Sequence, residues 1–141
     1  MGGSTIIFLM GPTAAGKTDL AISLANEFSL GLISVDASQV YRGLNIGTAK
    51  PAPAVLKKYP HALVDIRDPE DVFSAGAFCK ESVREVHRIV AKRQIPTLVG
   101  GTMFYFAALS DGLDRLPGAD AQFRYDIEVE AQQLGWPALY E

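Results

Sequence analysis

The sequence predicts an α/β protein in which a parallel β-sheet is covered by helices on both faces. Short apolar runs alternate along the chain with segments whose apolar residues follow the helical period. The runs do not alternate polar with apolar residues, which is typical of parallel strands buried on both faces. A glycine-containing loop joins the first run to the first helical segment, an order found in sheets that bind phosphate groups.

The first strand is expected over residues 5–10, and it leads into a phosphate loop at residues 11–18. This loop fits the pattern G-x-x-x-x-G-K-[ST] at every fixed position and predicts a P-loop NTPase-like fold. Its backbone N–H groups would point at one anion, and the N-terminus of the next helix would add positive charge. Lys17 would neutralise phosphate oxygens, and the Thr18 hydroxyl would bind a Mg²⁺ ion shared with the phosphates. The predicted phosphate-binding residues are Gly11, Pro12, Thr13, Ala14, Ala15, Gly16, Lys17 and Thr18.

The next elements bring a carboxylate toward this loop. A helix is expected over residues 19–28 and a second buried strand over residues 32–35, which delivers Asp36 at its carboxyl end. Residues 37–59 contain glycines and prolines but little periodicity, so we expect a long loop with one helical turn near residues 54–58. Loops of this length are usually functional, and this one is expected to cover a ligand.

The second half of the predicted sheet follows the same order. A third short strand is expected over residues 61–66. Ser74 is a good N-cap for a long helix over residues 75–93, whose charged side is expected to be solvated. A fourth strand over residues 96–99 runs into Gly100, Gly101 and Thr102, and helices are expected over residues 103–109 and 121–134. The composition changes between residues 111 and 120, which predicts a boundary there.

The carboxyl ends of parallel strands meet at one edge of a sheet, so the phosphate loop, Asp36 and residues 100–102 should share one rim. The loop would stabilise a phosphate leaving group or a transferring phosphoryl group, and Asp36 would accept a proton from a nucleophile. Asp36 has a competing interpretation as a capping residue or a ligand to Mg²⁺-bound water. Glycines end the fourth strand, whereas NTP-hydrolysing proteins place a second acid at the end of a central strand. Asp65 could serve as that acid only if residues 61–64 form this central strand. The loop is therefore compatible with a diphosphate that is released whole.

Composition limits what else the chain contains. Its 141 residues, 48% of them hydrophobic, suffice for one domain with a substantial core. A net charge of −3 gives no overall basic character, so a nucleic-acid partner would have to be held by a local patch. Cys79 is the single cysteine, and no long apolar segment opens the sequence. These features predict a cytoplasmic protein without a membrane partner.

Several groups of residues, in this order along the chain, resemble the bacterial tRNA dimethylallyltransferases of the tRNA isopentenyltransferase family. The resemblance implies transfer of a dimethylallyl group from dimethylallyl diphosphate to N6 of the adenosine 3′ of the anticodon in tRNA, with release of diphosphate. It rests on residues 11–18, 34–41, 42–51, 61–69, 73–75 and 100–105, and extends to residues 112–117 and 134–136.

The resemblance also implies roles for individual residues. Lys17, Asp36 and Thr102 would be catalytic: the phosphate loop with Lys17 and Mg²⁺ would hold the diphosphate, Asp36 would be the general base, and Thr102 would lie beside the reaction channel. Contacts with tRNA are implied for Asp36, Ala37, Ser38, Gln39, Thr102 and Arg124. The sequence departs from the family pattern at Ala15 and Ala37, where serine is common, and at Ala62, where histidine is frequent.

Family members are considerably longer, so the resemblance implies that this chain is an N-terminal fragment. Residues 1–112 would form the P-loop α/β core, and residues 113–141 would begin a helical tRNA-binding insertion. An arginine on the diphosphate and part of the tRNA surface have no counterpart here. We therefore expect the chain to be inactive alone and to self-associate through uncovered apolar surface.

Two alternatives share the predicted architecture. A small-molecule kinase of the shikimate kinase type also has a phosphate loop, an acid after the second strand and a glycine pair after a central strand. It lacks counterparts of residues 36–41 and 46–50. A nucleotide-binding module without catalytic activity is the other alternative.

Overall fold

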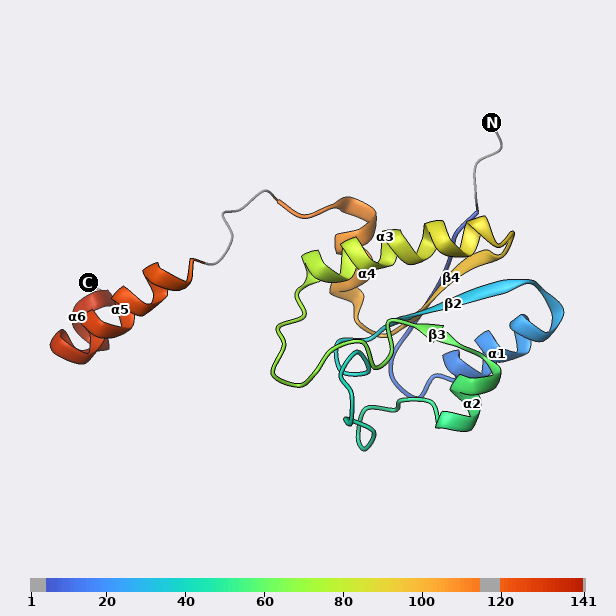
Figure 1. Cartoon of the computed structure of the whole chain (residues 1–141), viewed down its shortest axis with the longest axis horizontal. Helices are drawn as coiled ribbons and strands as arrows, with labels where there is room; N and C mark the ends of the chain where they lie inside the picture. The colour runs from blue at the N-terminus through green and yellow to red at the C-terminus, as the bar shows by residue number, and fades with distance from the viewer. Residues whose placement is uncertain (1–4, 115–119, 141) are drawn as a thin grey trace.

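The computed structural model describes residues 5–114 and 120–140 and has a four-stranded sheet in the order β1-β4-β2-β3 (Figure 1). All three strand pairs are parallel, as predicted. The strands are β1 (Ile7–Met10), β2 (Leu30–Val35), β3 (His61–Ala62) and β4 (Ile95–Gly100). The helices are α1 (Lys17–Glu27), α2 (Pro53–Lys58), α3 (Ala75–Ala91), α4 (Met103–Asp111), α5 (Ala121–Leu134) and α6 (Trp136–Tyr140).

Helices cover both faces of the sheet, and successive residues of a strand contact the helices on opposite faces. Leu32 packs with Ala21 of α1, whereas its neighbour Ile33 packs in a larger cluster with side chains of α3 and α4. In the larger cluster the rings of Phe78 and Tyr105 stack with centroids 4.5 Å apart, which joins α3 to α4. The continuous burial of β2 therefore comes from two separate contacts, one on each face.

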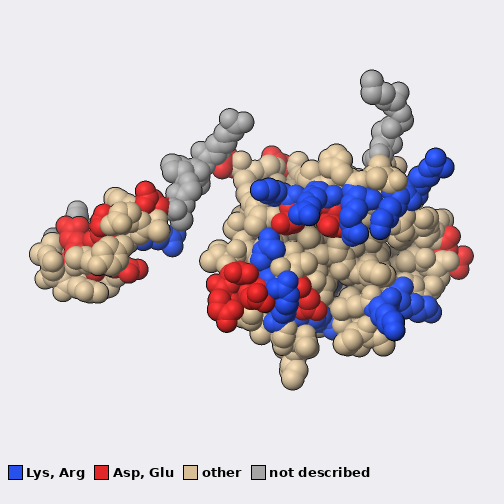
Figure 2. Space-filling model, in the orientation of Figure 1, with Lys and Arg blue, Asp and Glu red and all other residues tan. Residues whose placement is uncertain are grey.

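The long helix α3 has the expected start and the expected solvated side. The Ser74 hydroxyl accepts a hydrogen bond from Ala77 N at 3.2 Å, and this caps the first turn. Figure 2 shows basic side chains along the exposed side of α3, where Arg84 and Arg88 pair with glutamates of the same helix. The charged groups on this side are in contact with solvent, and some of them form local ion pairs.

The third strand is much shorter than predicted, because the backbone turns sharply after Ala62. Leu63 and Asp65 have φ values of 65° and 54°, which no regular strand contains. The chain then pairs with the loop after β2: Ile66 N and Arg67 N both donate to Val40 O, at 2.9 and 3.0 Å. The predicted strand over residues 61–66 is thus wrong beyond residue 62.

The end of β4 approaches β2 so closely that only glycine fits there. A Cβ atom on Gly100 would lie 2.0 Å from Val35 O and 2.8 Å from Val35 Cβ. This contact allows Thr102 N to donate to Val35 O at 3.3 Å, so the segment after β4 is joined to the end of β2. The glycines that end the fourth strand therefore bring two strand ends together.

The predicted helix over residues 121–134 is confirmed as α5. The Asp120 carboxylate caps it by accepting hydrogen bonds from Gln122 N and Phe123 N, and α5 packs against α6. Figure 1 shows this pair away from the sheet. Its exposed side chains include Phe123, Trp136 and Tyr140, but the expected self-association through such surface stays a prediction. The predicted boundary between residues 111 and 120 lies partly outside the described residues. None of the described helices is both long and apolar enough to cross a membrane.

Candidate anion-binding and catalytic site

One cavity of about 260 Å³ joins the three segments that were predicted to share a rim. It lies at the carboxyl edge of the sheet, between the phosphate loop, the end of β2 and the end of β4. Its polar lining combines a cation, a carboxylate and exposed backbone. The lining residues include Thr13, Ala14, Ala15, Gly16, Lys17, Thr18, Ser34, Asp36, Gln39, His61, Gly100 and Gly101.

The phosphate loop leaves the positive end of α1 open to this cavity. Gly16 has the left-handed conformation, with φ 75° and ψ 12°, and no side chain caps the helix that begins at Lys17. The first N–H groups of a helix have no partner within the helix, and they carry a partial positive charge. The loop is therefore shaped to receive an anion at its N–H groups.

The Lys17 side chain folds back across the phosphate loop. Its Nζ donates to Pro12 O at 2.5 Å, and its side chain is partly buried. An ammonium group carries three protons, so this single contact leaves donors that can reach a bound anion. Lys17 thus lies where the phosphate-loop pattern predicts, with its charge at the cavity.

Asp36 follows β2 directly and closes the turn that comes next. Its Oδ1 accepts hydrogen bonds from Ser38 N at 2.8 Å, Ser38 Oγ at 2.6 Å and Gln39 N at 3.2 Å. Its Oδ2 accepts none from the residues that the structure describes. The carboxylate is therefore fixed through one oxygen and has the other available at the cavity.

Thr102 lies at the start of α4 and bonds to the residue next to Asp36. Its Oγ1 accepts a hydrogen bond from Ala37 N at 3.2 Å. The hydroxyl keeps its own proton for a further acceptor. This hydrogen bond ties Thr102 to the residue that follows Asp36, although Thr102 and Ala37 are not among the residues that line the cavity.

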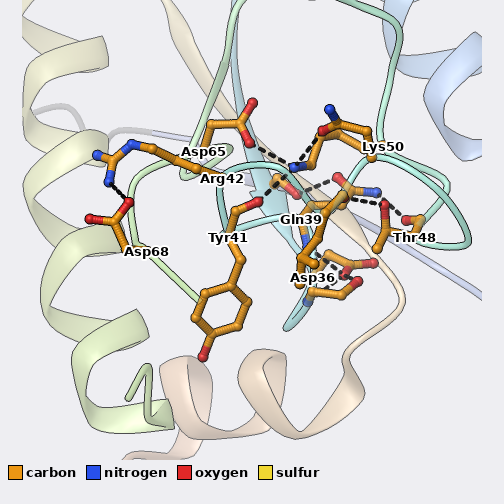
Figure 3. A network of polar contacts seen from close by, with 12 residues as sticks. Asp36, Gln39, Tyr41, Arg42, Thr48, Lys50, Asp65 and Asp68 are labelled. Carbon is orange, nitrogen blue, oxygen red and sulfur yellow. Dashed lines mark hydrogen bonds and ion pairs between the residues drawn. The ribbon is translucent and has the colours of Figure 1, made fainter. Parts of the chain in front are cut away.

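A network of polar contacts continues from Asp36 into the following loop (Figure 3). Gln39 uses its whole side-chain amide within the protein: Oε1 accepts from Ser34 Oγ at 3.0 Å, and Nε2 donates to Thr48 O and Ala49 O at 3.2 Å each. Lys50 pairs with Asp65 at 2.6 Å. Because β3 ends at Ala62, Asp65 does not end a strand as a second acid would, and it is a partner for Lys50.

His61 is a cavity residue that sequence reasoning missed. It pairs in register with Leu32, which places it on the α1 side of the sheet. Its Nδ1 lies 2.7 Å from Tyr59 O and must carry the proton, since a carbonyl oxygen only accepts. Its Nε2 is buried without a partner among the described residues. Burial lowers the pKa of His61, and the backbone hydrogen bond to Tyr59 only partly opposes this shift.

Lys50 was also missed as an individual residue, although the motif at residues 46–50 contains it. Its burial depends on Asp65, and no local pattern in the sequence connects the two. Arg124, in contrast, lies on α5, which Figure 1 shows away from the sheet, and it is not among the residues that line the cavity. The structure thus brings Lys17, Asp36, Gln39 and Thr102 together but does not add Arg124 to them.

A magnesium ion at this cavity would have few protein ligands. The described residues contain no group of three or more His, Cys, Asp or Glu side chains that could hold a metal. The Thr18 hydroxyl and the Asp36 carboxylate provide the oxygen ligands that Mg²⁺ prefers. These residues fit the ion only together with phosphate oxygens, as is usual where Mg²⁺ accompanies a phosphate substrate.

The fold and the cavity define a P-loop protein in which the phosphate loop and a carboxylate line the same cavity. Residues 39–141 match the family described as IPP transferase. The chain belongs to the IPP transferase family. This membership decides against the kinase of the shikimate kinase type.

Individual proteins to which the chain is similar support this assignment. The chain is 53% identical over 134 residues to the tRNA dimethylallyltransferase of Thiobacillus denitrificans, covering 95% of this chain and 43% of that protein. It resembles the full-length tRNA isopentenylpyrophosphate transferase of Bacillus halodurans with a TM-score of 0.76 and 35% identity, over 97% of this chain and 46% of the other. A eukaryotic dimethylallyltransferase described as acting on tRNA gives a TM-score of 0.72 at 25% identity, over 91% and 36% of the two chains. The P-loop NTPase-like fold is thereby confirmed, and the chain spans less than half the length of these relatives.

Proposed function

We propose that this chain supplies the diphosphate-binding and proton-accepting part of a tRNA dimethylallyltransferase. The reaction would transfer a dimethylallyl group from dimethylallyl diphosphate to N6 of the adenosine 3′ of the anticodon. The observation that carries the proposal is the single cavity shared by the phosphate loop and Asp36. The family and the names of its relatives support the choice of substrate.

The phosphate loop would bind the diphosphate and hold it as it leaves. The open end of α1 and the Lys17 ammonium both favour negative charge, which grows on the bridging oxygen as the carbon–oxygen bond breaks. Bound Mg²⁺, held by Thr18 and the phosphates, would neutralise part of this charge. Since the diphosphate leaves whole, the site needs no second acid of the kind used to hydrolyse nucleotides.

Asp36 would accept the proton that the adenine amine loses. The N6 atom attacks the allylic carbon, a C–N bond forms, the C–O bond to diphosphate breaks, and one N6 proton must leave. Asp36 Oδ2 has no partner among the described residues, while Oδ1 is held by Ser38 and Gln39. A base that is oriented in this way needs little rearrangement to take the proton.

Contact with tRNA would come from the segment after β2 and from the first turn of α4. Ala37 is exposed beside Asp36, and the Thr102 hydroxyl keeps a proton to donate. Gln39 would not use its side-chain amide to bind tRNA, because that amide already bonds to Ser34, Thr48 and Ala49. With a net charge of −3, the chain offers no general attraction to tRNA, so these contacts would be local.

The proposal can be tested in two proteins. The first is the chain itself, in which calorimetry should detect Mg²⁺-dependent binding of pyrophosphate. The second is a chimera in which this chain replaces the matching part of the Thiobacillus denitrificans relative. The chimera should transfer radiolabelled dimethylallyl groups to unmodified tRNA, and Asp36→Asn should abolish most of that transfer. A folded chimera that binds tRNA and pyrophosphate but transfers nothing would contradict the proposal.

A further inference from the structure

The loop between β2 and α2 forms one wall of the cavity and is held by two polar side chains, the buried Lys50 and the half-buried Gln39. Ala49 and Pro51 line the cavity, and Lys50 lies between them in the sequence. The loop itself is exposed, and Ile46 near its middle is 97% accessible to solvent. Val40 and Tyr41 at the start of the loop pack in the hydrophobic core, but none of residues 42–51 belongs to a core cluster, so the position of that stretch depends on polar contacts.

Lys50 makes the more unusual of these contacts. Its side chain is only 3% exposed, and its Nζ donates to Tyr41 O at 2.7 Å, Asn45 Oδ1 at 3.2 Å and Asp65 Oδ1 at 2.6 Å. An ammonium group has three protons, so these acceptors use all of them. Lys50 thus has no donor left for an anion (Figure 3). Both of its neighbours in the sequence nevertheless line the cavity.

Gln39 connects the same wall to the catalytic carboxylate. Its backbone N–H donates to Asp36 Oδ1, and its side-chain Nε2 donates to Thr48 O and Ala49 O. Ala49 has a φ of 50°, a conformation that alanine adopts only where its surroundings impose it. The wall is thus held from Gln39 on one side and from Lys50 on the other.

We propose that Lys50 is a positioning residue that acts through Asp65. The ion pair fixes residues 49–51 against the cavity, and this wall encloses the anion that the phosphate loop holds. The inference rests on the proposed function, because it takes the cavity as the diphosphate site. This positioning role differs from the usual role of a lysine near a phosphate, which is to contact the phosphate directly.

Substitution of Asp65 separates the two roles, because they predict opposite results. If Lys50 contacted the anion, Asp65→Asn would release its ammonium group and remove a nearby negative charge, so pyrophosphate would bind as tightly or more tightly. If Lys50 positions the wall, Asp65→Asn weakens binding just as Lys50→Met does. The double variant should then bind no more weakly than Lys50→Met alone.

The experiment measures pyrophosphate affinity with Mg²⁺ by calorimetry, and amide hydrogen exchange of residues 42–51, in the 141-residue chain. Lys50→Met and Asp65→Asn should each raise Kd by roughly 2- to 30-fold, the range for residues that act on a site without touching its ligand. Both should also speed exchange in residues 42–51. Lys17→Ala should raise Kd without changing that exchange.

Matched controls remove the effect of charge alone. Lys57→Met makes the same change on an exposed residue of α2, and Asp68→Asn opens the exposed ion pair between Arg42 and Asp68. Both should leave Kd and the exchange of residues 43–51 near those of the parent chain. If Lys50→Met fails to fold, Asn45→Ala removes one acceptor of the same ammonium group and should show the same effects in weaker form.

Two results would overturn different claims. Unchanged or tighter binding in Asp65→Asn, or unchanged exchange in Lys50→Met, would refute the positioning role while leaving the anion site intact. Unchanged binding in Lys17→Ala would instead refute the anion site and with it the proposed function.

Discussion

Replacement of Gly100 by alanine tests how the two central strands bring the site together. The new Cβ would lie 2.0 Å from Val35 O, whereas an ordinary van der Waals contact needs at least 3.4 Å. The obstacle is backbone, so no side chain can rotate away, and β2 and β4 must separate at their carboxyl ends. Overpacking costs about 1–3 kcal/mol when side chains can adjust, so we expect a loss of about 3 kcal/mol or more from the free energy of unfolding.

The same shift should disturb the site. Separation of the strands would break the hydrogen bond from Thr102 N to Val35 O, and it would also stretch the hydrogen bond from Ala37 N to Thr102 Oγ1. Urea denaturation followed by circular dichroism measures the stability, and calorimetry with pyrophosphate measures the site. Gly76→Ala is the control, because its Cβ would lie 3.8 Å from the nearest atom, and alanine favours the helix. A loss of less than about 1 kcal/mol in Gly100→Ala would refute the reasoning.

The remaining predictions concern single side chains. Lys17→Ala should weaken pyrophosphate binding by about 1.5–3 kcal/mol in calorimetry with little change in folding, because it removes one charge-assisted contact; unaltered affinity would show that Lys17 does not face the anion. Asp36→Asn should lower prenyl transfer by the chimera by roughly 10² to 10⁴ while pyrophosphate binding persists, since asparagine keeps an oxygen for the turn but accepts no proton; loss of Mg²⁺-dependent pyrophosphate binding would indicate a metal role instead. The pKa of His61 is lowered by burial, so the unfolded chain binds more protons once the pH falls below 6.5, and stability should decline from there down to the folded pKa. His61→Gln should flatten this decline in urea denaturation series between about pH 7 and about pH 5, and an equal decline in both proteins would contradict the assignment.

The strands and helices could be predicted because each leaves a local pattern. The runs of β1, β2 and β4 are largely apolar on both faces, and the start of α3 carries a predicted capping side chain, Ser74, that the structure confirms. The third strand is shorter than its sequence pattern because Leu63 and Asp65 adopt left-handed conformations. Leucine does not signal such a turn and aspartate signals it only weakly, and the contacts that impose it come from the loop after β2.

The site was predictable only in part, for a similar physical reason. Strand ends at one edge of a parallel sheet must lie near one another, so the sequence alone sufficed to place the phosphate loop close to Asp36. The sequence alone did not suffice to place Lys50 and His61. Lys50 depends on Asp65, 15 residues away, and His61 on Tyr59, 2 residues away, and the orientation of both partners follows from the fold. A lysine in a loop rich in glycine and proline is ordinarily solvated, and only the position of Asp65 shows that this one is buried.

The sequence allows three interpretations of Asp36, as a general base, as a cap for the next turn and as a ligand to Mg²⁺-bound water, and the structure makes the first two compatible. One carboxylate has two oxygens, and Oδ1 alone accepts the three hydrogen bonds from Ser38 and Gln39. These bonds prevent rotation of the side chain, and that keeps Oδ2 directed at one place. Since Gln39 also holds Ala49, the cap joins the base to the wall of the cavity. If Asp36 is the base we propose, capping is the means by which it is oriented, and a substitution that weakens the cap should also weaken catalysis.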